Sequence, residues 1–372
     1  MKTVAIVINT SWNIYNFRFN LARSLQNEGY KVICIAPHDA VYSPKIEQEF
    51  SFYPIAFDSK GINPFNDFMT MVSLWRLYRK IKPDVVLNYT IKPNLYSTYI
   101  AKLLGIKSIV NVSGLGTLFI TPSLITKLAQ QFYKVALRFT CKVFFQNHDD
   151  FNLFIEKGLV KKGKCSIIPG SGVDTHAFSP IAKAKEDNYF RFILVARMLK
   201  DKGIVEFAEA FCLLRQKYPH VKAYLLGPIG IENPTAITKQ EMHCLVEEKG
   251  VVYLGSSDGV ATILASMDCV VLPSYREGTP KSLLEAAAME KPIVTTNVAG
   301  CKDVVEDGIN GFLCKAKSVD SLYDAMEKMV LLSKEERESM GKEGREKMVK
   351  TFDESFVIER YSKAIKEALN SF

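Results

Sequence analysis

Four charged side chains in the C-terminal half of the chain have the types and spacing to bind a ligand that carries both phosphate and hydroxyl groups. Glu277 and Glu285 stand in EGTPKSLLE, and Arg197 and Lys202 stand in VARMLKDKG. An arginine can pair with a diphosphate through two parallel hydrogen bonds, and a lysine acts as a point charge beside it. A carboxylate beside a phosphate is costly unless it faces hydroxyl groups, so the glutamates favour a sugar over a bare phosphate.

The segment around the two glutamates predicts a strand, a loop and a helix in that order. The apolar run 269–272 indicates a buried strand, and 273–278 is the loop. Pro280 then lies in the first turn of a helix, with Thr279 as its N-cap. The free amides and the dipole at such a helix start attract anions. The alternative is an ordinary strand-to-helix connection with two solvated acids.

Short apolar runs alternate with helical patterns along the chain, which is typical of α/β proteins with a parallel, doubly wound sheet. The alternation restarts after the charged segment 181–188, where we place a linker. We therefore predict two Rossmann-like domains, residues 1–175 and 176–351, with the carboxyl ends of their sheets facing a central cleft. The predicted strands are 4–8, 31–36, 85–89, 108–112, 143–147, 190–196, 221–227, 250–255, 269–273 and 292–296. The predicted helices are 17–27, 95–104, 149–157, 205–215, 321–332 and 352–369, and 9–16 is predicted as a loop.

Several functional classes lack their motifs in this sequence. The loop after the first predicted strand, NTSWNIYNFR, has no glycine, so it cannot be the G-x-G-x-x-G turn of a dinucleotide-binding domain. The chain has no G-x-x-x-x-G-K-[ST] segment and no D-x-D, and its five histidines are dispersed. We therefore expect neither nucleoside triphosphate hydrolysis nor a bound metal. Eight cysteines without a C-x-x-C pair indicate reduced thiols in a cytosol.

The positive charge of the chain is concentrated in its first half. The net charge is +8, but the first 180 residues alone carry 21 Lys and Arg against 11 Asp and Glu. An anionic partner is therefore expected there: nucleic acid, a phosphorylated substrate or an acidic membrane face. Segments 68–80 and 124–139 are amphipathic and carry cations, so they could lie on an anionic membrane. The alternative is that both are helices packed on a sheet with a solvated basic edge.

With these residues in place, the chain resembles the GT-B glycosyltransferases of family 4, the large retaining group that uses nucleotide sugars. The resemblance covers essentially the whole chain and rests on Glu277 with Glu285, on the upstream pair Arg197 and Lys202, and on PGSGVD at 169–174. Within that group, NTSWNIYNFRFNLARSL and NYTIKPNLYSTYIAKLLGI look like bacterial enzymes that extend undecaprenyl-diphosphate-linked sugars. Among them is the N-acetylgalactosaminyltransferase of N-glycan assembly, which uses UDP-N-acetylgalactosamine.

The resemblance implies a GT-B fold in which the last helix, 352–372, crosses back onto the N-terminal domain. It implies that Arg197 and Lys202 bind the donor diphosphate and stabilise the departing UDP. Glu277 would hold the hydroxyl groups of the donor sugar and Glu285 those of the ribose. Backbone around the loop and helix start would close on sugar and phosphate, at Gly278, Thr279, Pro280, Ser282 and Leu283. No metal or other cofactor is implied.

The partners expected from the resemblance are a nucleotide-sugar donor, a polyprenyl-diphosphate-linked sugar acceptor and the inner face of the cytoplasmic membrane, with no nucleic acid. Acceptor contacts are assigned from loop position only. These residues are Ser11, Asn13, Arg18, Lys92, Asn94 and Gly114. Many family members have a glycine pair in the first loop, where this chain has Ser11, Trp12 and Asn13. The alternatives left open are a GT-B nucleotide-sugar epimerase, a transferase for soluble acceptors, and a nucleotide-binding module without enzymatic activity.

Overall fold

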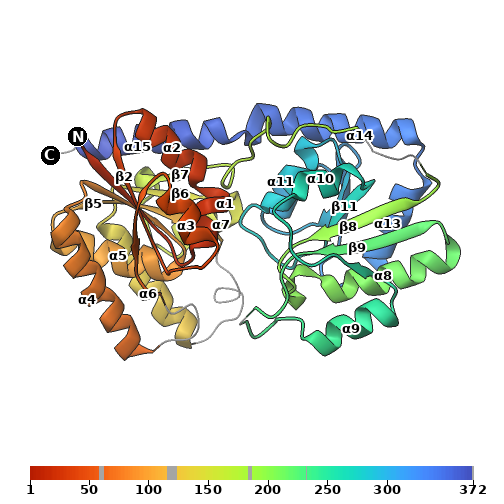
Figure 1. Ribbon diagram of the computed structural model, residues 1–372, viewed down its shortest axis with the longest axis horizontal. Helices are drawn as coiled ribbons and strands as arrows, with labels where there is room; N and C mark the ends of the chain where they lie inside the picture. The colour runs from red at the N-terminus through yellow and green to blue at the C-terminus, as the bar shows by residue number, and fades with distance from the viewer. Residues whose placement is uncertain (58–62, 115–123, 183–186, 232, 371–372) are drawn as a thin grey trace. The chain divides into compact units, whose positions relative to one another are not determined.

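The computed structural model describes residues 1–57, 63–114, 124–182, 187–231 and 233–370, and it divides into two compact units. Unit 1 consists of residues 1–171 and 356–372, and unit 2 consists of residues 172–355. Each unit is a parallel sheet with helices on both faces (Figure 1). The chain thus has the GT-B architecture of two Rossmann-like domains. The linker predicted at 181–188 lies partly outside the described residues.

Unit 1 contains a seven-stranded sheet in the order β3-β2-β1-β4-β5-β6-β7, and all its strand pairs are parallel. Its strands are β1 (Thr3–Val7), β2 (Lys31–Ala36), β3 (Ser51–Pro54), β4 (Val85–Tyr89), β5 (Lys107–Val112), β6 (Lys142–Phe145) and β7 (Cys165–Ile167). Its helices are α1 (Ser11–Phe17), α2 (Phe19–Asn27), α3 (Tyr42–Glu47), α4 (Pro64–Ile81), α5 (Ile91–Leu103), α6 (Leu124–Arg138), α7 (His148–Glu156) and α15 (Glu354–Asn370).

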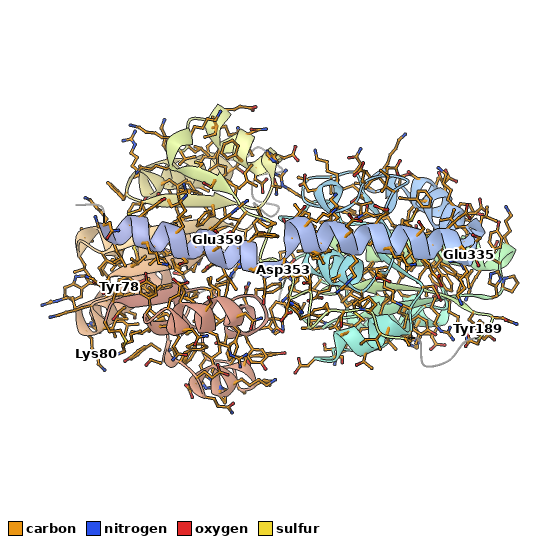
Figure 2. The ribbon with its side chains drawn as sticks, turned by 90° about the horizontal axis from the view of Figure 1, so that it is seen from above. Tyr78, Lys80, Tyr189, Glu335, Asp353 and Glu359 are labelled. Atoms are coloured by element: carbon orange, nitrogen blue, oxygen red, sulfur yellow. The ribbon has the colours of Figure 1, made fainter. Side chains whose placement is uncertain are left out.

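Alternate side chains of the unit 1 strands point to opposite faces of the sheet, and each face has its own helical cover. Ile6 and Leu87 pack with α1, α2 and α15, whereas Val7 and Val86 pack with α4 and α5. Figure 2 shows α15 from above, with Glu359 labelled on it. Tyr361 and Ile365 of α15 are almost fully buried in the same cluster as β1 and β4. The expected return of the last helix to the N-terminal domain is therefore confirmed.

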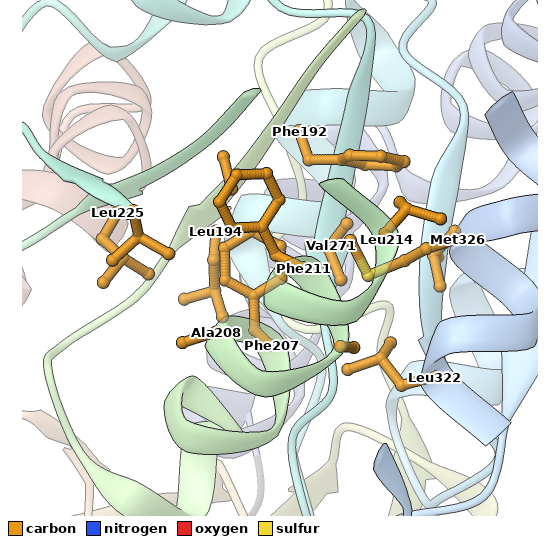
Figure 3. Packing of buried hydrophobic residues seen from close by; sticks show 14 of the residues in the cluster. Phe192, Leu194, Phe207, Ala208, Phe211, Leu214, Leu225, Val271, Leu322 and Met326 are labelled. Carbon is orange, nitrogen blue, oxygen red and sulfur yellow. The ribbon is translucent and has the colours of Figure 1, made fainter. Parts of the chain in front are cut away.

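Unit 2 contains a six-stranded parallel sheet in the order β10-β9-β8-β11-β12-β13. Its strands are β8 (Phe190–Val195), β9 (Val221–Leu226), β10 (Val252–Tyr253), β11 (Cys269–Leu272), β12 (Ile293–Thr296) and β13 (Gly311–Cys314). Its helices are α8 (Ile204–Lys217), α9 (Lys239–Glu247), α10 (Val260–Ala265), α11 (Lys281–Ala288), α12 (Cys301–Val304), α13 (Val319–Leu331) and α14 (Lys334–Lys347). Phe192 of β8, Phe207 of α8 and Leu322 of α13 meet on one face of this sheet (Figure 3). Helices α10, α11 and α12 pack on the other face.

The two chain segments that join the units are hydrogen-bonded to each other. The Val173 amide donates to the Phe352 carbonyl at 2.9 Å, and the Glu354 amide donates to the Val173 carbonyl at 3.0 Å. The Thr175 hydroxyl donates to the Asp353 carboxylate at 2.6 Å. Gly172 has a φ of 72°, and a Cβ there would lie 2.4 Å from the Glu354 Cα, so this crossing requires glycine.

The structure differs from the sequence prediction at several short elements. Residues 9–16 were predicted as a loop, but 11–17 form α1, because Thr10 caps its start by accepting from the Asn13 amide at 3.2 Å. Three edge or near-edge strands, β3, β7 and β13, have no counterpart among the predicted strands. Each has only three or four residues, and β3 and β7 are only partly buried, so neither carries a long apolar run.

Candidate active site

The predicted site residues of unit 2 lie where the sheet topology places a crevice. Strands β8 and β11 are neighbours, but the helices that follow them, α8 and α11, cover opposite faces of the sheet. The loops after two such strands diverge, and the carboxyl edge between them is the usual ligand position in an open α/β sheet. Arg197 and Lys202 belong to the first loop, and Glu277 belongs to the second.

The two loops are in direct contact through backbone atoms. Gly203 has a φ of 74°, and a Cβ on it would lie 2.2 Å from the Pro273 carbonyl oxygen. The Asp201 carbonyl accepts from the Tyr275 amide at 2.9 Å and from the Ser274 hydroxyl at 3.1 Å. Only glycine permits this approach, and the paired carbonyl fixes the relative register of the loops.

A third loop, after β12, holds the second loop from its other side. The Glu277 amide donates to the Ala299 carbonyl at 3.2 Å. Gly300 has a φ of 81°, and a Cβ there would lie 2.3 Å from the Gly278 carbonyl oxygen. The backbone of Glu277 is therefore clamped between the loops that follow β8 and β12.

The structure brings Lys202 and Glu277 together as an ion pair between Nζ and Oε1. Their side chains are 17% and 14% exposed, so the pair is shielded from solvent but still reachable. Arg197 has an exposed side chain and makes no ion pair with the described residues. Its guanidinium is thus available to a ligand at the same carboxyl edge of the sheet.

Three side chains that the sequence reasoning missed interact beside this ion pair, at the loop that carries Glu277. The Tyr275 hydroxyl donates to Glu206 Oε1 on α8, which ties the loop of Glu277 to the helix that follows Lys202. The amino group of Lys317 lies 4.8 Å from the centre of the Tyr275 ring. No sequence pattern pairs Tyr275 with Glu206, because the contact joins residues far apart in the chain.

Glu285 lies inside α11 with a side chain only 12% exposed. Burial raises the pKa of Glu285 to about 7, and Lys281, whose Nζ is 3.8 Å away, opposes this shift only in part. A desolvated carboxyl group costs free energy when it ionises. Hydroxyl groups of a ligand would therefore stabilise the ionised form of Glu285 by donating hydrogen bonds to it.

The start of α11 differs from the prediction by one residue. Pro280 is the N-cap, and no side chain caps the helix, so Thr279 does not have the predicted N-cap role. Proline has no amide hydrogen to donate at this position. The Leu283 amide bonds to the Pro280 carbonyl at 3.1 Å, and the Leu283 side chain is buried in the core. Gly278 is buried, and Ser282 is half-buried on the first turn.

Four of the six residues assigned to the acceptor side have roles within unit 1. Ser11 is buried and donates to the Pro37 carbonyl at 2.6 Å. Lys92 pairs with Asp67 at 2.7 Å, and Asn94 is buried and donates to the Asn111 carbonyl at 2.9 Å. Asn13 is half-buried on α1, and its amide donates to the Thr10 side chain that caps that helix.

The remaining two residues lie at the carboxyl edge of the unit 1 sheet. Gly114 follows β5 with a φ of 118° and is half-buried. Arg18 is buried between α1 and α2, with its guanidinium stacked on the Tyr89 ring. Across the described ranges, no group of three or more His, Cys, Asp or Glu is arranged to hold a metal ion. Over the same ranges, no helix is long and apolar enough to span a bilayer.

This fold and this pair of loops define a GT-B glycosyltransferase. Residues 177–347 match the family model described as glycosyl transferases group 1, and residues 3–147 match the model described as glycosyl transferase 4-like. The first match lies in unit 2 and the second in unit 1. The chain therefore belongs to this group of glycosyltransferases, as its resemblance implied.

Two curated relatives act on undecaprenyl-diphosphate-linked sugars by name. N,N'-diacetylbacillosaminyl-diphospho-undecaprenol alpha-1,3-N-acetylgalactosaminyltransferase of Campylobacter jejuni is 26% identical over 94% of this chain and 95% of its own length. UDP-Gal:alpha-D-GlcNAc-diphosphoundecaprenol alpha-1,3-galactosyltransferase of Escherichia coli is 25% identical over 81% of this chain and 80% of its own length. Among solved structures, HepE from Anabaena in complex with UDP has a TM-score of 0.79 and 15% identity, with 99% of this chain and 100% of HepE covered.

The raised pKa of Glu285 predicts a pH-dependent stability. Between the ordinary value of 4.5 and about 7, the folded protein keeps a proton that the unfolded chain has released. Stability therefore falls as pH rises through this window. We expect Glu285→Gln to raise the free energy of unfolding by roughly 2–3 kcal/mol at pH 8.5 and by less than about 1 kcal/mol at pH 5.

Urea unfolding at the two pH values measures this difference. Glu247→Gln, on the exposed end of α9, is the matched control and should change stability little at either pH. An equal effect of Glu285→Gln at pH 5 and pH 8.5 would show that Glu285 is not desolvated.

Proposed function

We propose that this protein transfers a hexose or N-acetylhexosamine from a UDP-sugar onto an undecaprenyl-diphosphate-linked sugar, with retention of anomeric configuration. The proposal of a UDP-sugar donor is supported by the ion pair of Lys202 and Glu277, whose loops are held in place by their neighbours. The exposed guanidinium of Arg197 lies at the same edge of the sheet. A shielded lysine and an arginine suit a diphosphate, and two glutamates suit the hydroxyl groups of sugar and ribose. Fixed cations would stabilise negative charge on the departing UDP.

The proposal of an undecaprenyl-diphosphate-linked acceptor is based on the relatives of the chain. Two relatives at 26% and 25% identity carry undecaprenyl diphosphate acceptors in their names, and their matches cover most of this chain. They differ in the donor sugar that their names give. UDP-N-acetylgalactosamine is our first choice because N-acetylgalactosamine is the sugar in the name of the relative with the longer match, and UDP-galactose is the first competitor.

For the transfer step we propose attack on the same face as the departing phosphate. The described residues hold Glu277 in an ion pair with Lys202, which suits a positioning role better than attack on the sugar. The departing phosphate oxygen would take the proton of the acceptor hydroxyl as the new glycosidic bond forms and the bond to UDP breaks.

A donor screen tests this function. UDP release is followed with UDP-N-acetylgalactosamine, UDP-galactose, UDP-glucose and a GDP-sugar, each with and without a synthetic polyprenyl-diphosphate sugar. The expected result is release that depends on the lipid acceptor and on one UDP-sugar, with an α-configured product by NMR. Release with soluble sugars alone, or an epimerised donor without transfer, would favour the alternative GT-B activities.

Removing the Glu277 carboxylate should abolish transfer and leave the fold intact. Glu277→Ala is expected to lower kcat/KM by 100-fold or more, because transition-state contacts at a sugar are lost. Circular dichroism and the unfolding midpoint monitor the fold, and Glu335→Ala on α14 is the matched control in the same unit. Wild-type turnover in Glu277→Ala would remove this residue from the site.

We also propose that transfer needs no divalent cation, because Arg197 and Lys202 supply positive charge for the leaving diphosphate. Activity in excess EDTA should stay within about twofold of the untreated enzyme. A loss that only a divalent ion restores would contradict this proposal.

A lipid acceptor suits an enzyme that docks on a membrane, and we propose that unit 1 does so through α6 and α4. The exposed apolar residues of α6 and the residue after it recur at spacings of four, three and four, which forms a stripe along the helix. They are Leu128, Phe132, Val135 and Phe139. Exposed Lys127 and Arg138 flank the stripe, and Lys102 of α5 lies 5.6 Å from the Phe139 ring centre.

Helix α4 presents a second apolar surface with cations on the same sheet face. Phe65, Phe68 and Met69 are exposed on its first turns, and Arg79 stacks on the exposed Trp75 at 4.8 Å. Both α4 and α6 contact α5, and Figure 1 shows these three helices in the same part of unit 1. Aromatic residues beside cations match the interface of an anionic bilayer.

The double variant Phe132→Ser/Val135→Ser should bind vesicles containing an anionic phospholipid at least tenfold more weakly in co-sedimentation, because apolar burial is lost. Charge removal at Arg76, Arg79 and Lys80 should also weaken binding, more at low salt than at high salt. The control Leu213→Ser/Leu331→Ser removes exposed apolar residues from unit 2 and should leave binding unchanged. Equal loss in the control would contradict docking through unit 1.

A further inference from the structure

Arg18 is a buried cation without an anionic partner. Its side chain is only 3% exposed. Its guanidinium carbon lies 4.3 Å from the centre of the Tyr89 ring, but no carboxylate or carbonyl of the described residues pairs with it. Its Nε is enclosed and has no acceptor. Taking a charge out of water without pairing it is unfavourable, so a purely structural arginine would be expected to have a partner.

Glu28 and Glu49, two acids on the elements around α2, already have partners. Glu28 accepts from Ser362 and pairs with Lys366 of α15. Glu49 pairs with Arg23, the other arginine of this region. The groups around Tyr89 are neutral: Tyr361 packs at 5.9 Å from it, and the Tyr361 hydroxyl accepts from Asn111 at 2.7 Å. The positive charge of Arg18 is therefore not neutralised by these groups, and an anionic ligand would neutralise it.

The position of Arg18 is that of a ligand-binding crevice. In unit 1, β1 and β4 are neighbours, and the sheet order reverses between them. The helix α2 that follows β1 packs on one face, whereas α5 that follows β4 packs on the other. Arg18 comes from the first connection and stacks on Tyr89, the last residue of β4. This is the topological switch point of the unit 1 sheet.

The backbone directly after Tyr89 is also arranged for an anion. Thr90 has a φ of 65° and a ψ of 165°, a conformation that is nearly restricted to glycine, and no side chain caps the start of α5. Backbone strain of this kind is retained where the surrounding structure imposes it, often at binding sites. An uncapped helix start offers amide donors and a positive dipole end.

We propose that Arg18 binds the diphosphate group of the lipid-linked acceptor at the β1–β4 switch point. This proposal rests on the acceptor class proposed above. The planar fork of the guanidinium matches two phosphoryl oxygens, and stacking on Tyr89 holds the fork in place while the ligand is absent. The ligand would supply the negative charge that the protein itself does not.

Direct binding tests the proposal without requiring transfer. Isothermal titration of the full chain with geranyl diphosphate is performed in saturating UDP, which occupies the donor site of unit 2. Arg18→Met should weaken binding at least tenfold. Arg23→Met removes the same charge from an exposed, paired arginine on α2 and should change affinity less than twofold. Equal affinity of Arg18→Met and the wild type overturns the proposal.

Thermal unfolding separates binding from a structural role. The unliganded Arg18→Met variant should melt at or above the wild-type temperature, because an unpaired buried charge has been removed. Geranyl diphosphate should raise the wild-type midpoint and not that of the variant. A large drop in the unliganded midpoint, with ligand stabilisation retained, would assign Arg18 a structural role instead. If Arg18→Met does not fold, Arg18→Lys keeps the charge without the fork and should show an intermediate loss of affinity.

Two further comparisons identify the ligand and distinguish a failure of this proposal from a failure of the proposed function. Binding of geranyl diphosphate at least tenfold tighter than inorganic phosphate supports the lipid diphosphate, and equal affinity overturns that assignment. If the donor screen finds no lipid-dependent transfer but Arg18-dependent binding persists, the proposed function fails and the diphosphate site stands. If transfer occurs and the KM for the lipid acceptor is unchanged in Arg18→Met, the site fails and the function stands.

Discussion

The ion pair between Lys202 and Glu277 is the interaction on which the arrangement of unit 2 depends. Its two members come from loops that follow neighbouring strands and lead to helices on opposite faces of the sheet. Such loops would diverge without a tie. Gly203 against Pro273, the doubly paired Asp201 carbonyl and the Tyr275–Glu206 contact all hold the loops at the separation that the ion pair needs. A glycosyltransferase built in this way has preorganised charge, so little reorganisation is required when the donor arrives.

The two units differ in how a shielded cation is paired. In unit 2, Lys202 has an internal carboxylate and would exchange part of that pairing for a ligand. In unit 1, Arg18 is buried and its guanidinium is stacked on the Tyr89 ring, a neutral group. The first arrangement stabilises the unliganded protein, whereas the second leaves the unliganded protein with a desolvation cost. The positive charge of the first 180 residues thus includes one buried cation, Arg18, and exposed cations on α4 and α6, besides those on other elements.

Much of the fold follows from local signals in the sequence. The central strands β1, β4, β8 and β11 consist mainly of apolar, buried residues bounded by polar loops, and all were predicted. The short strands β3, β7 and β13 were not, because pairing at the sheet edge rather than residue pattern makes them strands. Helix α1 was predicted as a loop, since its aromatic and polar residues lack a regular apolar period and its stability comes from the Thr10 cap and packing on α3.

The candidate site was predictable in part for the same reason. Glu277, Glu285, Arg197 and Lys202 lie next to strong strand and helix patterns, so their place at a carboxyl edge could be inferred from order alone. Glu206 and Ala299 could not be found in this way, because each contacts the Glu277 loop from a distant part of the chain. Ser11, Lys92 and Asn94 were assigned to the acceptor side because each follows a predicted strand. Their burial and pairing could not be predicted, because these depend on distant residues. The partners are Pro37, Asp67 and Asn111, respectively.

The hydrogen bonds that join Val173 to Phe352 and Glu354 have a consequence for how such enzymes can diversify. Unit 2 starts and ends at one bonded pair of segments, so in covalent terms it is an insertion into the chain of unit 1. A different insertion with the same pair of ends would leave the first sheet and its last helix unaltered. Recombination at these two positions could therefore replace the half that carries Glu277 while preserving the half that carries Arg18.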